Sequence, residues 1–272
     1  MGTEEAFLQT KIAYENYFSQ QEQKFFDINR VPGNGVLVFP LSMSRLHKGQ
    51  DPKALYDFLC FFDQKLVEKS VDVIFLYTNG LYFNNIGVSP EYRKKTTAQM
   101  LTHKQELNRL IKKHNRFSPK AIHFLPWDYI ILQCDTYLEL QAEFLKLMDA
   151  DSVFKQLIDC EIKTTTETKL EARAFIIEES IVTYLIRNKK IVLPMTLSDA
   201  NAWRLLLYSG RCLTPDVYLY QKKLLPQQVS SQDQWFHQTT SYSMYNMEKR
   251  ILVDYNKIDF SALTQGKAVE YS

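Results

Sequence analysis

The sequence lacks the motifs that identify many nucleotide-dependent, metal-dependent and serine-dependent enzymes. It contains no GxGxxG or GxxxxGK[ST] loop, no HExxH helix and no GxSxG elbow, so a phosphate cradle, a zinc hydrolase site and an α/β-hydrolase triad are not expected. The 4 cysteines form no CxxC pair, which gives no sign of a zinc site or of a secreted disulfide framework. The sequence therefore predicts neither a cofactor nor a metal.

Long apolar runs and an excess of one charge are also missing. No run of about 18 apolar residues occurs, and the acidic first residues lead into no signal-peptide core. The 33 Lys and Arg against 31 Asp and Glu give a formal charge of +2, so a nucleic-acid site would have to come from local clustering. We expect a cytoplasmic monomer that contacts neither membrane nor DNA.

The pattern of apolar residues predicts an α/β fold. Short runs rich in β-branched and aromatic residues alternate with segments of helical spacing. The predicted strands are Val36 to Leu41, Val71 to Tyr77, Ala121 to Leu125, Ile191 to Pro194 and Trp203 to Tyr208. This alternation predicts a parallel sheet of about five strands with helices on both faces, as in Rossmann-like three-layer domains.

Helix starts and the tail divide the chain further. Capping residues followed by a good first turn predict helices after Asp51-Pro52, Ser89-Pro90-Glu91, Asp135 and Thr214-Pro215-Asp216, the last running from Val217 to Leu225. We expect residues 1–226 to form one catalytic domain. Residues 227–272, which lack clear periodicity, are expected to form a C-terminal extension that is either packed on the domain or partly disordered.

Two adjacent carboxylates, Glu178 and Glu179, lie inside an apolar stretch. Neighbouring helix positions point about 100° apart, so one carboxylate can reach solvent while the other is driven toward the apolar side. A buried carboxylate needs a partner, because leaving it unpaired costs several kcal/mol. Two interpretations follow: a structural pair in which Glu179 bridges to Arg173 or Arg187, or a site in which Glu179 binds a cationic ligand group. In both, Glu178 is a solvated or outer neighbour.

The predicted strand ends supply further polar groups. Ligands of open parallel sheets bind beyond the carboxyl ends of the strands. The first strand runs into Ser42 and Ser44, and the last ends at Tyr208. A serine in a loop is more often a turn or cap residue than a nucleophile, and a tyrosine alone is more often a half-buried core residue. Their convergence on one edge favours a ligand site.

A basic helix is predicted from Glu91 to about Asn115. Its apolar residues Met100, Leu107, Leu110 and Ile111 fall in one arc; Lys94, Arg109, Lys112 and Arg116 fall opposite, with Arg93 and Lys104 at the border. Only Glu106 interrupts the positive charge after Glu91, so the pairing typical of a solvated helix is mostly missing. A solvated face remains the alternative to contact with nucleic-acid phosphates, which we favour.

Taken in order, these elements resemble the tRNA-dependent cyclodipeptide synthases. The resemblance covers roughly Val36 to Leu225: a strand ending in a serine, a basic helix, a helix of Tyr-x-x-x-Glu type and a strand ending in tyrosine. It implies a fold similar to the catalytic domain of class I aminoacyl-tRNA synthetases, without their ATP signatures. It also implies an aminoacyltransferase that joins the amino acids of two aminoacyl-tRNAs, used sequentially, into a cyclic dipeptide (diketopiperazine).

The resemblance assigns roles by position. Ser42 matches the serine that carries the aminoacyl and dipeptidyl groups, Glu179 the glutamate that holds the α-ammonium group, and Tyr208 the tyrosine that positions substrate or moves protons. Phe175 stands where the family has tyrosine, so that hydroxyl is either lost or supplied by Tyr184 or another residue.

Two further positions concern the family's subgroups. Arg45 replaces the Asn that one subgroup has three residues after the serine, which favours the other subgroup. Ser209 departs from the Pro that the other subgroup commonly has after the tyrosine. The expected substrate-binding residues are Arg45, Phe175, Val38, Pro40, Val182 and Leu206, and the expected tRNA-binding residues are Arg93, Lys94, Lys104, Arg109, Lys112 and Lys113.

Two other classes of function stay open. A non-catalytic tRNA- or RNA-binding protein on the same fold is favoured by the departures at Phe175 and Ser209. A serine hydrolase or small-molecule transferase would turn over without charged tRNA. An aminoacyl ester is already activated, so the synthase reaction needs orientation and proton transfer rather than ATP.

Overall fold

The computed structural model describes residues 34–43, 50–66, 70–78, 90–114, 122–162, 169–187, 191–194, 203–208, 242–246 and 251–254. Within these ranges, six strands form one sheet in the order β3-β2-β1-β4-β5-β6. They are β1 (Asn34–Leu41), β2 (Ser70–Tyr77), β3 (Ile122–Pro126), β4 (Trp203–Tyr208), β5 (Tyr242–Asn246) and β6 (Ile251–Asp254). All neighbouring pairs are parallel except β5 and β6, which are antiparallel.

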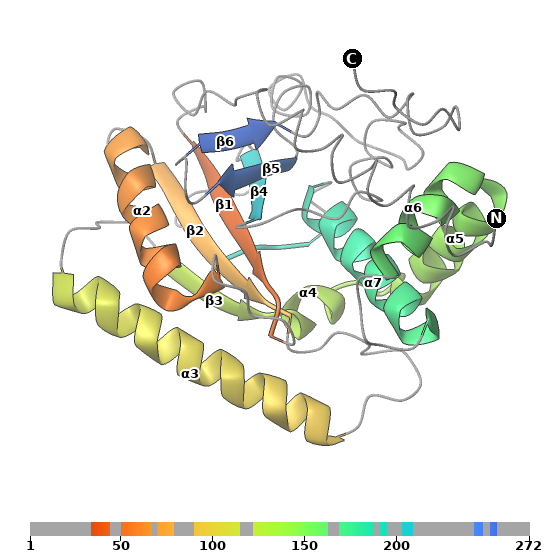
Figure 1. Cartoon of the computed structure of the whole chain (residues 1–272), viewed down its shortest axis with the longest axis horizontal. Coiled ribbons are helices and arrows are strands. Elements are labelled where there is room, and N and C mark those ends of the chain that lie inside the picture. Colours follow the sequence, from red (N-terminus) through yellow and green to blue (C-terminus); the bar gives the residue numbers. More distant parts are fainter. Residues whose placement is uncertain are drawn as a thin grey trace, which may run out of the picture.

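Helices cover both faces of this sheet, as Figure 1 shows. On one side lie α2 (Pro52–Leu66) and α3 (Pro90–His114). On the other lie α4 (Asp128–Ile131), α5 (Tyr137–Ala150), α6 (Ser152–Ile162) and α7 (Lys169–Arg187). The predicted α/β architecture with a parallel sheet between two helical layers is therefore confirmed. No helix in the described part of the chain is long and apolar enough to cross a membrane.

The sheet separates two apolar cores because successive side chains of a strand point to opposite faces. Val36 and Val38 belong to the core beneath α4 to α7, whereas Leu37 and Phe39 belong to the core beneath α2 and α3. All four side chains are at most 1% exposed. Burial on both faces explains why β1 reads as a continuous apolar run rather than an alternating one.

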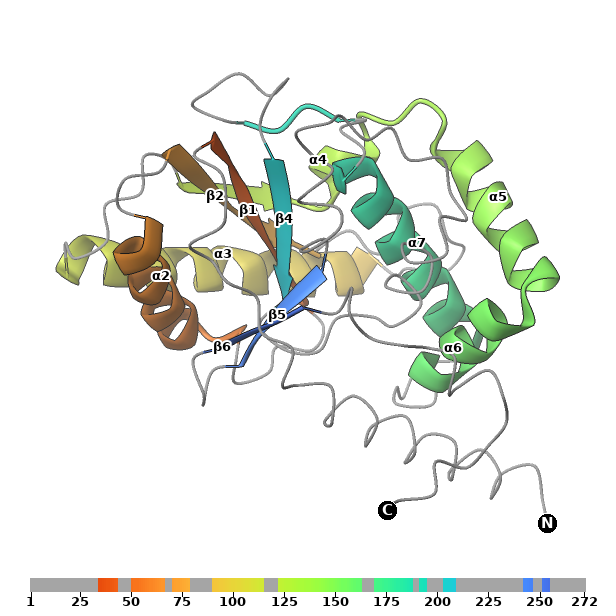
Figure 2. The same ribbon diagram turned by 90° about the horizontal axis from the view of Figure 1, so that it is seen from above.

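The helix α7 is enclosed on several sides. It contacts α4, α5, α6 and β4, and the view in Figure 2 shows it between the sheet and α5. Its residues Ile176, Ile177, Ile181 and Val182 are at most 2% exposed. A helix in this position has no broad solvent face, so its two adjacent carboxylates, Glu178 and Glu179, are both buried.

One predicted strand is wrong. Ile191 to Pro194 forms no strand, because its backbone bonds to side chains instead of a neighbouring strand. Gln133 Oε1 accepts from Val192 N at 3.0 Å and Gln133 Nε2 donates to Val192 O at 3.2 Å. Arg204, which is 1% exposed, donates to Ile191 O at 3.0 Å and to Ile186 O at 2.9 Å. Arg204 thereby ties the last turn of α7 to β4.

The sheet also extends into a segment that lacks clear periodicity. The strands β5 and β6 lie in the segment that was expected to be a C-terminal extension, and β5 pairs with β4. The predicted helix from Val217 to Leu225 lies outside the described residues. At α2, the predicted cap is confirmed: Asp51 Oδ1 accepts from the backbone N–H groups of Lys53 and Ala54, each at 2.9 Å.

Candidate functional site

The order of the strands reverses beside β1. From β1 the chain passes to β2 and β3 on one side and later returns to β4 on the other. In open α/β sheets, ligands bind at such a switch point, beyond the carboxyl ends of the strands. Ser42 follows β1 directly and Tyr208 is the last residue of the adjacent strand β4. The register of the two strands pairs Val38 with Leu206, so Ser42 and Tyr208 both stand at this edge.

The turn that carries Ser42 is fixed from β2 by Thr78. Thr78 N and Oγ1 both donate to Leu41 O, each at 2.9 Å. The same Oγ1 accepts from Met43 N at 3.2 Å. Thr78 and Met43 are 4% and 0% exposed. One side chain thus holds the backbone on both sides of Ser42, which is itself partly buried.

Gln50 holds a further backbone group of that turn, the N–H of Ser42. Its Oε1 accepts from Ser42 N at 3.3 Å, and its own carbonyl accepts from His103 Nε2 at 2.7 Å. His103 Nδ1 lies 3.0 Å from Tyr77 Oη. Gln50 and His103 are 7% and 4% exposed. A buried chain of hydrogen bonds therefore runs from β2 through α3 to the Ser42 turn.

The chemistry of the groups fixes the direction of these bonds. A carbonyl can only accept, so His103 Nε2 carries the proton and Nδ1 accepts from the Tyr77 hydroxyl. Burial lowers the pKa of His103, although the bond to Gln50 and the charges of Glu106 and Asp51 oppose this. Burial also raises the pKa of Tyr77, which stays a phenol. His103 is thus a neutral imidazole that donates to Gln50.

Glu178 is fully buried, at 0% exposure. Trp127 Nε1 donates to its Oε1 at 3.2 Å, and Tyr137 Oη donates to its Oε2 at 3.1 Å. Burial raises the pKa of Tyr137, and the negative charge of Glu178 raises it further. The expectation that Glu178 is solvated is wrong, because α7 is covered by neighbouring helices on the side where a surface helix would meet water.

Glu179 lies next to this buried group and is 8% exposed. Arg173, one of the two cations considered as its structural partner, donates to Asp159 Oδ1 at 2.8 Å. The side chain of Arg187 lies outside the described residues. Burial of both carboxylates in one enclosed helix keeps Glu179 a candidate for binding a cationic group.

The missing tyrosine of the Tyr-x-x-x-Glu pattern is not replaced from Tyr184. Phe175 is partly buried against the core beneath α4 to α7. Tyr184 stands five residues after Glu179 and therefore about 140° around the helix from it. Its ring packs edge-on against Phe144 of α5, with centroids 6.4 Å apart. The phenol of Tyr137 contacts the carboxylate pair through its bond to Glu178.

The predicted faces of the basic helix α3 are confirmed. Leu107 is buried, and Met100, Leu110 and Ile111 pack beside it against the core beneath α2. Lys94, Arg109, Lys112 and Lys113 are exposed, whereas Arg93 and Lys104 are half-buried.

The two half-buried cations of α3 have identifiable surroundings. Lys104 Nζ lies 5.4 Å from the centre of the Phe124 ring. The charge of Arg93 lowers the pKa of Asp128, against the larger upward effect of burial on that carboxyl. Arg116 lies outside the described residues. The exposed cations Lys94, Lys95, Arg109, Lys112 and Lys113 therefore form a solvent-facing basic surface on α3.

The expected substrate-binding residues are only partly placed. Val38 and Val182 share one core and are 0% and 1% exposed, and Pro40 is buried in β1. Leu206 and Tyr208 are described as backbone positions of β4, and Arg45 lies outside the described residues.

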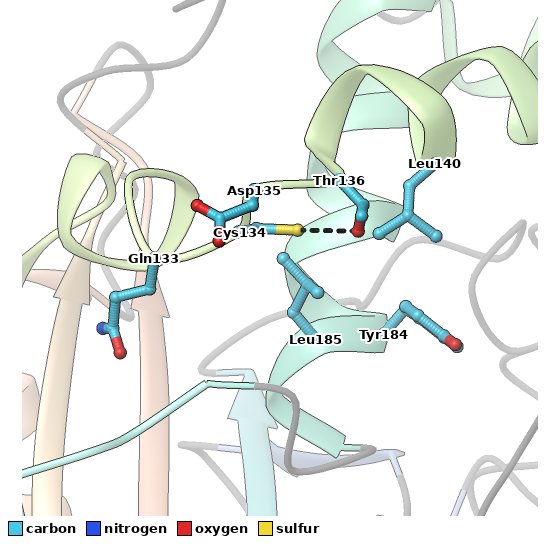
Figure 3. Close-up of a pocket in the computed structure, with 7 residues that line it drawn as sticks. All are labelled: Gln133, Cys134, Asp135, Thr136, Leu140, Tyr184 and Leu185. Carbon is cyan, nitrogen blue, oxygen red and sulfur yellow. Dashed lines mark hydrogen bonds between the residues drawn. The ribbon is translucent and has the colours of Figure 1, made fainter.

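A cavity of about 350 Å³ lies elsewhere, between the loop that joins α4 to α5 and the end of α7. Figure 3 shows that Gln133 and Tyr184 point away from each other across it. These two side chains therefore do not converge on a common point, whereas Cys134 Sγ lies 3.7 Å from Thr136 Oγ1.

Sequence reasoning missed Thr78, Gln50 and His103 as supports of Ser42, and Trp127 and Tyr137 as donors to Glu178. Thr78 directly follows β2, so the rule that directs attention to strand ends could have found it. The other contacts join residues 8, 41, 51 and 53 positions apart, and no local pattern indicates them.

No protein-family model and no curated protein matches the sequence. Similar solved structures include cyclodipeptide synthases (CDPS). A CDPS from Fluoribacter dumoffii has 12% identity over 69% of this chain and 82% of that chain, with a TM-score of 0.45. A CDPS from Staphylococcus haemolyticus has 12% identity over 78% and 90%, with a TM-score of 0.47.

A third similar structure is that of a Mycobacterium tuberculosis protein, whose structure is said to demonstrate that cyclodipeptide synthetases are related to type I tRNA synthetases. It has 16% identity over 73% of this chain and 80% of that chain, with a TM-score of 0.42.

Replacing Tyr137 by Phe is expected to lower the free energy of unfolding by about 1–3 kcal/mol, because one oxygen of the buried Glu178 loses its donor. Urea denaturation of Tyr137→Phe, Glu178→Gln and the double variant measures this loss and the coupling between the two residues. Additive losses would contradict a direct bond.

The stability of the protein should depend on His103 below neutral pH. The pKa of His103 lies below its ordinary value of 6.5, so the unfolded chain takes up a proton first as the pH falls through that value. Stability should therefore decrease from pH 7 toward pH 5, and less steeply in His103→Gln. Melting temperatures of both proteins across this range measure the difference, and parallel curves would refute it.

Proposed function

We propose that this protein is a tRNA-dependent cyclodipeptide synthase in which Ser42 is the nucleophile. The observation that supports this most directly is the placement of Ser42 and Tyr208 at the ends of adjacent parallel strands, at the switch point of the sheet. The helix that leads into β4 carries the buried pair Glu178 and Glu179. A nucleophile, a phenol and a carboxylate are the groups that aminoacyl transfer from an activated ester needs.

In the proposed reaction, Ser42 Oγ attacks the ester carbonyl of the first aminoacyl-tRNA. A seryl ester forms, the bond to the tRNA ribose breaks, and the serine proton passes to the leaving ribose hydroxyl. The neutral amine of the bound residue then attacks the ester carbonyl of the second aminoacyl-tRNA. A peptide bond forms, the bond to the second tRNA ribose breaks, the amine proton passes to the leaving ribose hydroxyl, and a dipeptidyl-enzyme results. Attack of the new amino terminus on the seryl ester closes the ring and restores the Ser42 hydroxyl.

Glu179 is proposed to hold the α-ammonium group of the first residue. A carboxylate in a site of low water content binds an ammonium group more strongly than one in solvent does. Glu178 has both oxygens engaged by Trp127 and Tyr137, which holds in place the helix turn that carries Glu179. Tyr208 is proposed to position the substrate or to relay a proton.

The basic surface of α3 is proposed to contact the phosphates of the acceptor stem. Its exposed members are Lys94, Lys95, Arg109, Lys112 and Lys113. Lysine and arginine contacts to phosphate bind RNA through its backbone without reading its sequence. This matches a reaction that must accept two aminoacyl-tRNAs in succession.

Expression of the protein in a bacterial host should release a cyclic dipeptide into the medium, detected by mass spectrometry. Ser42→Ala should abolish the product, and Ser44→Ala should retain it, because only Ser42 follows β1 directly. The proposal would be contradicted if the wild type made no new diketopiperazine, or if Ser42→Ala made the same amount. Salt-sensitive tRNA binding without any product would instead favour a non-catalytic RNA-binding protein.

Removing two charges from α3 should weaken the use of tRNA. Lys112→Ala combined with Lys113→Ala is expected to raise the KM for aminoacyl-tRNA and to flatten its salt dependence, because fewer counterions are released on binding. Lys146→Ala with Lys155→Ala, on the exposed faces of α5 and α6, serves as the matched control. The same change in KM in both double variants would show that the tRNA site does not lie on α3.

A further inference from the structure

Three backbone groups of the Ser42 turn are held by side chains from outside it. Thr78 binds Leu41 O and Met43 N, and Gln50 binds Ser42 N. With the peptide groups on both sides of Ser42 fixed, the remaining freedom of its hydroxyl is mainly rotation about χ1, which has three staggered positions. The position of a serine nucleophile in this turn therefore depends on Gln50 as well as on Thr78.

Gln50 is itself immobilised from two directions. Its carbonyl receives the 2.7 Å bond from His103 of α3. The next residue, Asp51, caps α2 through its bonds to Lys53 N and Ala54 N. Gln50 is 7% exposed, so water competes little for either bond. Its side-chain oxygen is consequently presented to Ser42 from a fixed backbone.

We propose that Gln50 is a positioning residue for Ser42, and that His103 keeps Gln50 in place. The inference rests on the proposed function for its consequence in catalysis, but the geometry of the turn can be tested without any substrate. Through His103, the Ser42 turn is also joined to the helix that carries the basic surface. A displacement of α3 at His103 would therefore be transmitted to the backbone of the proposed nucleophile.

Two measurements test the Ser42 N to Gln50 Oε1 bond separately: hydrogen exchange reports whether the bond is present, and kcat reports whether catalysis depends on it. Gln50→Leu removes the acceptor at similar size, whereas Gln50→Glu keeps an oxygen in place. Amide hydrogen exchange of Ser42, followed by NMR, should be faster in Gln50→Leu and remain slow in Gln50→Glu. In the same proteins, kcat for cyclic dipeptide formation should fall about 10- to 100-fold in Gln50→Leu, with the KM for aminoacyl-tRNA unchanged and activity kept in Gln50→Glu.

The variants His103→Phe and His103→Gln provide a second route if Gln50→Leu folds poorly. Phe removes the donor to the Gln50 carbonyl, and Gln retains an N–H group near the position of Nε2, so only Phe should accelerate exchange at Ser42. Gln105→Leu, at an exposed position of α3, is the matched control and should change nothing.

Unchanged exchange at Ser42 in both Gln50→Leu and His103→Phe would overturn the inference, even if the wild type forms a cyclic dipeptide. A loss of stability with an unaltered kcat per folded molecule would overturn it as well, since that is the mark of a merely structural residue. Faster exchange in variants of a protein that makes no cyclic dipeptide would support the positioning of the turn and refute the proposed function alone.

Discussion

Burying a carboxylate obliges the surrounding structure to supply a donor for each of its oxygens. Glu178 imposes this requirement on the layer formed by α4 to α7, and Trp127 and Tyr137 meet it from the end of β3 and the start of α5. Hydrogen bonds to charged groups contribute about 1.5–3 kcal/mol each, and leaving such a group unsatisfied costs more. The end of β3, the start of α5 and helix α7 are therefore held together around the Glu178 side chain. Glu179, the next residue of α7, is held in a fixed position beside it.

The opposite layer fixes the proposed nucleophile in a similar way but with neutral groups. Thr78 and Gln50 bind the backbone of the turn after β1, and His103 binds the carbonyl of Gln50. Because His103 belongs to α3, the packed face of that helix holds the turn while its exposed face carries Lys94, Arg109, Lys112 and Lys113. One helix thus links a basic surface to a strand end, which explains how a net charge of only +2 is compatible with an RNA partner.

The elements that could be predicted from the sequence are those with a strong local pattern. β1, β2, β3 and β4 were indicated by apolar runs, and the two faces of α3 by residue spacing. Ile191 to Pro194 looked equally strand-like, but side chains of Gln133 and Arg204 bind its backbone, and contacts of that kind have no sequence signature. The burial of Glu178 was mispredicted because the helical rule assumes one solvent face, whereas α7 is enclosed by its neighbours.

The most direct measurement is the mass of the peptide that contains Ser42 after the purified protein has been incubated with aminoacyl-tRNA and digested. The account predicts an added aminoacyl group on this peptide, sensitive to hydroxylamine and absent from Ser42→Ala. An unmodified peptide in the wild type, or an adduct that persists in Ser42→Ala, would contradict the assignment of Ser42 as the nucleophile.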